Sequence, residues 1–110
     1  MSSWKDEAAV NVITRTMRVQ LIKTLDIEKG STMMKNMAKQ FNANDIDYIC
    51  CSPSAFARAR RFIDVLSDRM TTELFSIFVH TLDDWVLQEE ILQAYTLQGG
   101  DIKKLTPEFQ

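Results

Sequence analysis

The stretch from Ser52 to Met70, SPSAFARARRFIDVLSDRM, decides the fold class of this chain. It opens with Ser and Pro, which favour the cap and the first turn of an α-helix. Apolar residues then recur at steps of three and four, namely Ala55, Ala59, Phe62, Ile63, Leu66 and Met70. This spacing predicts an amphipathic helix with one buried face.

The same spacing continues on both sides of this stretch. It predicts a long helix over about residues 4–25, a helix capped by Ser31, a short helical segment from Asn44 or Asp45, and a final helix from Thr71 or Thr72 to a stop at Gly99-Gly100. The sequence therefore predicts an all-α fold of four to five helices. We expect one dimeric domain over residues 1–98 and a flexible C-terminal tail over residues 99–110.

Composition and cysteine placement indicate where the protein works. The chain has 110 residues, of which 45% are apolar and 25% charged, which suits one globular domain with a single core. Its N-terminus resembles no secretion signal, and no apolar run reaches the roughly 18 residues of a membrane span. Cys50 and Cys51 are adjacent, which excludes an intramolecular disulfide framework. We therefore expect a cytoplasmic protein in a reducing compartment, with no membrane contact.

The residues that could carry catalysis are few. His80 is the only histidine and lies among aromatic residues, where a structural role is favoured over that of a general base. The acidic pairs Asp83-Asp84 and Glu89-Glu90 do not converge on a helix, because neighbouring residues point about 100° apart. No motif for a nucleophile, a phosphate loop or a zinc site occurs. The sequence therefore predicts no enzyme, no metal or other cofactor, and no small-molecule substrate.

Positive charge is concentrated in the middle of the chain. The formal net charge is −2, but residues 51–71 carry an excess of basic residues and residues 72–110 an excess of acidic ones. Arg58, Arg60, Arg61 and Arg69 are candidates for contact with DNA phosphates or with an acidic partner. The first three are expected to lie largely in water. The alternative is a solvated face in which Arg60 pairs with Asp64, one helical turn away.

The final helix carries apolar residues around more than one face. Such a helix is either central in the core or part of an interface, and we favour self-association or a partner. The candidate interface residues are Phe75, Phe78, Leu82, Trp85 and Val86.

Four segments resemble the FlhD-type transcriptional activator subunits, which include the flagellar master-regulator subunit and its relatives on conjugative plasmids and integrative elements. The segments are Val19–Ile22, Glu28–Met34, Asn44–Ile46 and Cys51–Phe56, and the resemblance extends from about Val12 to Met70. The cysteine that links two subunits in the flagellar protein falls near Leu66, so that disulfide is not expected here.

The resemblance implies an all-helical subunit that forms a homodimer and joins an FlhC-like second regulatory subunit. Such a complex binds promoter DNA and activates flagellar or conjugation genes. The acidic C-terminal third fits a chain that needs a more basic partner to bind DNA. The alternative hypothesis is a small helical adaptor or inhibitor, of a mobile-element or phage type, that binds a host protein through the helix containing Trp85.

Overall fold

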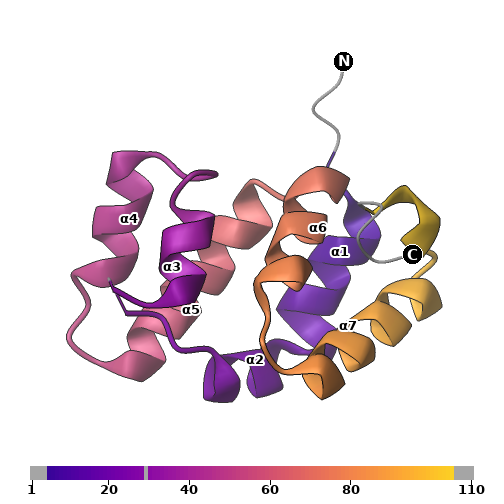
Figure 1. Ribbon diagram of the computed structural model, residues 1–110, viewed down its shortest axis with the longest axis horizontal. Coiled ribbons are helices and arrows are strands. Elements are labelled where there is room, and N and C mark those ends of the chain that lie inside the picture. The colour runs from indigo at the N-terminus through magenta and orange to yellow at the C-terminus, as the bar shows by residue number, and fades with distance from the viewer. Residues whose placement is uncertain (1–4, 29, 106–110) are drawn as a thin grey trace.

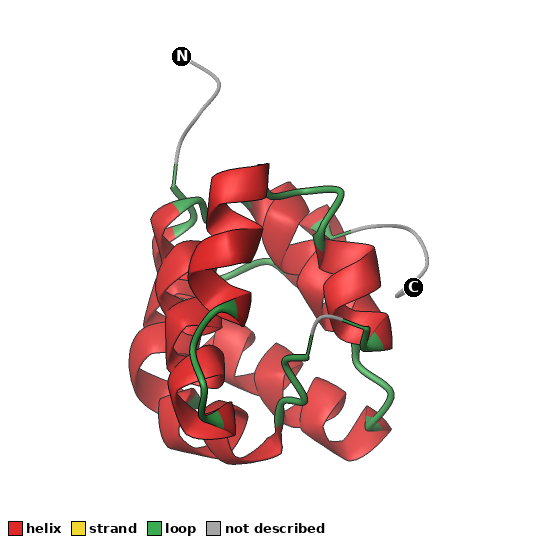
Figure 2. Ribbon diagram, turned by 90° about the vertical axis from the view of Figure 1, so that its left-hand side faces the viewer, coloured by secondary structure: helices red, strands yellow, loops and turns green. Residues whose placement is uncertain are grey.

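The computed structural model describes residues 5–28 and 30–105, and every regular element within these ranges is helical (Figures 1 and 2). The elements are α1 Glu7–Asn11, the π-helical segment η1 Val12–Thr16, α2 Arg18–Thr24, α3 Thr32–Met37, α4 Ala43–Cys50, α5 Ala55–Asp68, α6 Thr72–Thr81, α7 Trp85–Leu97 and the 3₁₀ turn η2 Ile102–Lys104. The all-α prediction is confirmed. The predicted count of four to five helices is wrong, because two long predicted helices are divided.

The predicted helix over residues 4–25 is divided into α1, η1 and α2; residue 4 itself lies outside the described ranges. The Met17 amide donates to the Val12 carbonyl at 2.8 Å, a bond that spans five residues. The buried residues here recur every four positions. In an α-helix, each such step moves the side chain about 40° further around the helix axis. The wider π turn offsets this drift. Ala9, Ile13, Met17 and Leu21 therefore all remain buried.

Short polar residues begin the next helices, although not always at the predicted positions. Ser31 caps α3 as predicted, through a 3.2 Å bond to the Met34 amide. α4 begins after Asn42, which forms a capping box with Asp45, so the predicted start at Asn44 or Asp45 is wrong. Ser54 caps α5 by accepting from the Ala57 amide at 3.0 Å.

Helix α5 buries one face in the core. Its Phe62 ring packs against Phe41 and Phe78, with ring centroids 5.9 Å apart in both pairs. Ala59, Ile63 and Leu66 are fully buried on the same face. The amphipathic helix predicted within the stretch from Ser52 to Met70 is therefore confirmed, although it spans Ala55–Asp68 and its cap is Ser54 rather than Ser52.

The predicted final helix breaks at Leu82, whose backbone is extended with φ −73° and ψ 129°. Asp84 begins a new helix, because its Oδ1 accepts hydrogen bonds from the amides of Val86 and Leu87 at 3.0 and 3.2 Å. The Thr71 cap of α6 is confirmed by a 3.1 Å bond from the Leu74 amide.

The predicted stop at Gly99-Gly100 is confirmed. Gly99 has a φ of 93°, in a region of backbone conformation that residues with a Cβ rarely adopt. A Cβ at Gly100 would lie 2.5 Å from the ring of Tyr95. Beyond the stop, Leu105 is buried. Flexibility of the tail over residues 99–110 stays a prediction, and residues 106–110 lie outside the described ranges.

The helices form two groups that α2 joins. In Figure 1, α3, α4 and α5 lie on the left, whereas α1, α6 and α7 lie on the right. Helix α2 lies along the lower edge between the beginnings of α5 and α7. One continuous cluster of buried apolar residues runs through both groups. The lower edge thus presents parts of three helices side by side.

Candidate functional site

The Arg58 side chain is largely buried and hydrogen-bonded to two loops, contrary to the expectation that it lies largely in water. Its Nε donates to the Ile27 carbonyl at 2.8 Å and its Nη1 to the Ser52 carbonyl at 3.0 Å. Its side chain is 17% exposed. The arginine therefore joins the loop after α2 to the loop before α5, because it satisfies two carbonyls there that belong to no helix.

Arg61 and Arg69 also bind groups of the chain itself. Arg61 donates to the Tyr48 carbonyl at 2.8 Å, and its guanidinium lies 4.7 Å from the centre of the Tyr48 ring. Arg69 forms a two-pronged pair with Asp45, at 2.7 and 2.9 Å. The hydrogen bonds from Arg69 lower the pKa of the Asp45 carboxyl below its ordinary value. Both arginines attach α5 to α4.

Arg60 is exposed, as predicted, and its guanidinium lies 5.7 Å from the centre of the Phe56 ring. Within the described ranges it has no ion pair, so the predicted pairing with Asp64 is not formed. Of the four candidate arginines, Arg60 is the one whose charge is not already bound by a carbonyl or a carboxylate. The sequence pattern therefore overestimated the positive charge available to a partner.

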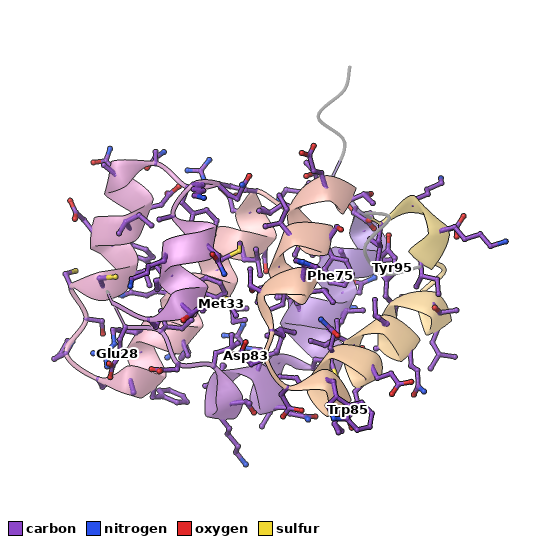
Figure 3. The ribbon with its side chains drawn as sticks, viewed as in Figure 1. Glu28, Met33, Phe75, Asp83, Trp85 and Tyr95 are labelled. Carbon is purple, nitrogen blue, oxygen red and sulfur yellow. The ribbon has the colours of Figure 1, made fainter. Side chains whose placement is uncertain are left out.

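The five candidate interface residues divide between core and surface. Phe75 and Phe78 are fully buried and Leu82 is 9% exposed, so these three serve the core of the single chain rather than an interface. Trp85 is 69% exposed and Val86 49%. Figure 3 shows Trp85 at the lower edge, pointing away from the body. The break at Leu82 is the reason, because it places Trp85 and Val86 in the first turn of a separate helix.

A groove between α2 and the beginning of α5 was not predicted from the sequence. It has a volume of about 360 Å³ and is lined by Arg18, Val19, Ile22, Lys23, Phe56 and Arg60. Val19 and Phe56 are 66% and 60% exposed. Both are apolar residues that lie outside the repeating apolar positions of their helices, and this was the signal in the sequence that could have indicated an exposed apolar site. The groove combines exposed apolar surface with three cations, none of which forms an ion pair with another described residue.

The groove and the first turns of α7 lie on either side of α2. The Gln20 amide donates to Glu90 Oε1 at 2.9 Å, which joins α2 to α7. At the other end of α2, Thr24 lines a cleft of about 400 Å³ together with Asp84 and Leu87. The two helices therefore run past each other in opposite directions. We call the residues that this edge presents the α5–α2–α7 surface: the exposed Phe56, Arg60, Val19, Lys23, Trp85, Val86, Glu89 and Glu90, and the half-buried Arg18.

The groups considered for catalysis do not come together. Asp84 is occupied as the cap of α7, and the neighbouring Asp83 is exposed (Figure 3). Cys50 and Cys51 are both unpaired thiols, and His80 is exposed in the last turn of α6. Within residues 5–28 and 30–105, no group of three or more His, Cys, Asp and Glu side chains is placed to hold a metal ion.

None of the described helices combines the length and the apolar character needed to cross a membrane. Comparison of the chain with protein-family models, with curated proteins and with solved structures finds no match. The FlhD-type resemblance therefore stays a prediction from the sequence.

Proposed function

We propose that this protein is a regulatory subunit, without catalytic activity, that acts by binding other polypeptides. One observation carries the proposal: exposed apolar side chains from three helices gather on the α5–α2–α7 surface. Trp85, Phe56 and Val19 are each more than half exposed there. Large apolar side chains grouped in this way are typical of protein interfaces, in which aromatic residues supply much of the binding energy.

The specific form of this role is the activator subunit that the FlhD-type resemblance implies. In it the chain forms a homodimer in the cytoplasm, joins a second regulatory subunit and contacts promoter DNA as part of that complex. The placement of the arginines favours contact with DNA through the partner. Arg58, Arg61 and Arg69 bind the chain's own carbonyls and carboxylate, so few cations remain to neutralise phosphates.

A second candidate is the helical adaptor or inhibitor that binds a host protein and no DNA. The exposure of Trp85 favours it, because an indole that is 69% exposed at a helix start is a ready anchor for a pocket on another protein. The two candidates use the same surface. They differ in what the captured partner does.

The test uses the tagged full-length chain expressed in its native host. Partners captured by it are identified, purified and mixed with the chain on promoter fragments in a gel-shift series. An activator subunit gives a sequence-specific shift with the complex and only weak, salt-sensitive binding alone. An adaptor gives a complex without a shift. Nanomolar sequence-specific DNA binding by the isolated chain would contradict both.

Matched variants connect the result to the surface. Phe56→Ser should lose the partner, because the ring is exposed on the proposed surface and carries little of the core. Leu97→Ser is the control, since Leu97 is 86% exposed at the far end of α7. Equal loss of the partner in both variants, or in neither, would contradict binding at the α5–α2–α7 surface.

A further inference from the structure

The groove between α2 and α5 is lined by apolar and cationic side chains in equal number. The apolar ones are Val19, Ile22 and Phe56, and the cationic ones are Arg18, Lys23 and Arg60. Val19 and Phe56 are more than half exposed, so most of their apolar surface is not used by the core of the chain. The groove therefore offers a ligand both apolar contacts and positive charge.

The two walls of the groove repeat the same pattern. On α2, Val19 is followed by Lys23 four residues later. On α5, Phe56 is followed by Arg60 at the same spacing, with the guanidinium 5.7 Å from the centre of the Phe56 ring. Residues four apart are neighbours on one side of an α-helix. Each wall therefore presents an exposed apolar side chain and, one helical turn away, a cation.

The architecture of the groove favours a helical ligand. Every regular element of residues 5–28 and 30–105 is helical, so this part of the chain offers an extended segment no sheet edge to pair with. A helix satisfies its own backbone groups and needs only side-chain contacts, and an amphipathic helix lays its apolar face into such a groove. The ligand that fits is a helix with one apolar face.

The sign of the charge on that helix follows from the surroundings of the groove. None of its three cations forms an ion pair with another described residue. Across α2, which lies between α5 and α7 in Figure 1, the charge is negative. Glu89 and Glu90 are exposed on α7, and Asp26, Asp83 and Asp84 line the cleft at the end of α2. An acidic ligand is thus attracted to the groove and repelled from the α7 side.

We infer that the groove binds an acidic amphipathic helix of a partner polypeptide. The apolar face of this helix packs on Val19 and Phe56, and carboxylates beside that face contact Lys23 and Arg60. Apolar contacts of this kind give affinity, and the charges around them give orientation and selectivity. The inference rests on the proposed function and deepens it, because it names the chemistry of the segment by which a partner is recognised.

The experiment is a selection on the immobilised full-length chain from displayed helical peptides of random sequence, each about five turns long. The selected peptides should carry large apolar residues at steps of three and four, with Asp or Glu beside that face. Selection of basic peptides, of acidic peptides without an apolar face, or of nothing above the background of the bare support would overturn the inference.

A charge reversal tests the selectivity directly. In the variant that carries Lys23→Glu with Arg60→Glu, the dissociation constant of a selected acidic peptide should rise by about tenfold or more. The same variant should select basic amphipathic helices instead. The matched control, Lys35→Glu with Lys39→Glu, reverses two exposed charges on the α3 side and should bind the acidic peptide as the wild type does. Equal affinity of the two variants would overturn the inference.

The apolar contact has a matched pair of variants as well. Phe56→Ser should weaken the selected peptide by about tenfold, as expected for the loss of an aromatic anchor. Trp85→Ser removes an aromatic ring that is 69% exposed on the acidic side of α2, and should leave the peptide bound. Equal losses in the two variants would place the peptide outside the groove. Helical circular dichroism should match the wild type in every variant.

The remaining outcomes distinguish this inference from the proposed function. Displacement of the selected peptide by duplex DNA at equal concentration would make nucleic acid the occupant and overturn the inference. A chain that selects no acidic helix, but captures a partner in its host and loses it in Phe56→Ser, would overturn the inference and leave the proposed function standing. Selection of acidic helices by a chain that captures no partner in its host would overturn the proposed regulatory role alone.

Discussion

The Tyr95 hydroxyl donates a 2.6 Å hydrogen bond to Asp6 Oδ2, which attaches the second half of α7 to the cap of α1. Thr72 donates to the same oxygen at 2.7 Å, and the Ala9 amide donates to Asp6 Oδ1 at 3.2 Å. One carboxylate thus joins the beginnings of α1 and α6 to α7. Because α7 contributes Trp85 and Val86 to the α5–α2–α7 surface, this contact helps to fix the position of those residues relative to the rest of the chain.

Tyr95→Phe should lower the free energy of unfolding at neutral pH by about 1.5–3 kcal/mol, the usual contribution of a hydrogen bond to a charged group. Burial, and then the hydrogen bond to Asp6, raise the pKa of Tyr95 above its ordinary value. Above pH about 10 the unfolded chain therefore loses the Tyr95 proton while the folded chain keeps it, so stability falls as pH rises. The difference between wild type and variant should shrink from pH 9 to 11, as urea unfolding would show.

Tyr48→Phe is the matched control for this pH dependence. Tyr48 is 47% exposed, and its ring, which phenylalanine retains, lies under the guanidinium of Arg61. The control should therefore keep the full alkaline loss of stability. If the curve of Tyr95→Phe ran parallel to the wild type over the same range, the hydrogen bond to Asp6 would have no role in it.

Arg58→Gln should lower the free energy of unfolding by about 1–3 kcal/mol, because two carbonyls lose their charged donor. Arg60→Gln, two residues away, should change it by no more than about 0.5 kcal/mol, because Arg60 is exposed and unpaired among the described residues. Urea unfolding of both variants measures the contrast. Equal stability of the two would indicate that the bonds to Ile27 and Ser52 contribute nothing.

Asp84→Ala should lower the free energy of unfolding by about 0.5–2 kcal/mol, because the amides of Val86 and Leu87 lose their acceptor. The adjacent Asp83→Ala should change it by at most about 0.5 kcal/mol, since Asp83 caps no helix. Hydrogen exchange of the two α7 amides should accelerate in the first variant only. Accelerated exchange in Asp83→Ala instead would reverse the assignment of the cap.

Apolar spacing was enough to predict the class of the fold and the amphipathic character of α5, because the period of buried residues is regular from Ala59 to Leu66. It could not predict the break at Leu82. Apolar residues continue across that position, so their spacing alone favours one continuous helix. The structure instead begins a new helix after Asp84, which caps it by accepting hydrogen bonds from the Val86 and Leu87 amides. The missed break also explains why Phe78 was assigned to the same interface as Trp85.

The surface was harder to predict than the core for a related reason. Arg58 and Arg60 are both polar residues on the same predicted helix, and nothing in their spacing shows that one meets a carbonyl from a loop 31 residues earlier while the other does not. Such contacts depend on the tertiary path of the chain. The groove beside Val19 and Phe56 has the same origin, because its walls come from two helices that are distant in sequence.

The last prediction concerns acid and the pair of Asp45 with Arg69. Because the hydrogen bonds from Arg69 lower the pKa of Asp45 in the folded chain, the pair stabilises the protein above the ordinary pKa of 3.8 and ceases to do so as pH falls through the lower folded value. Asp45→Asn should therefore be less stable at pH 7 and lose less stability between pH 5 and 3 than the wild type. Asp47→Asn, on the exposed side of α4, should follow the wild-type curve. A carboxyl titration of Asp45 by NMR supplies the direct measurement, and a midpoint at or above 3.8 would contradict the pairing with Arg69 in solution.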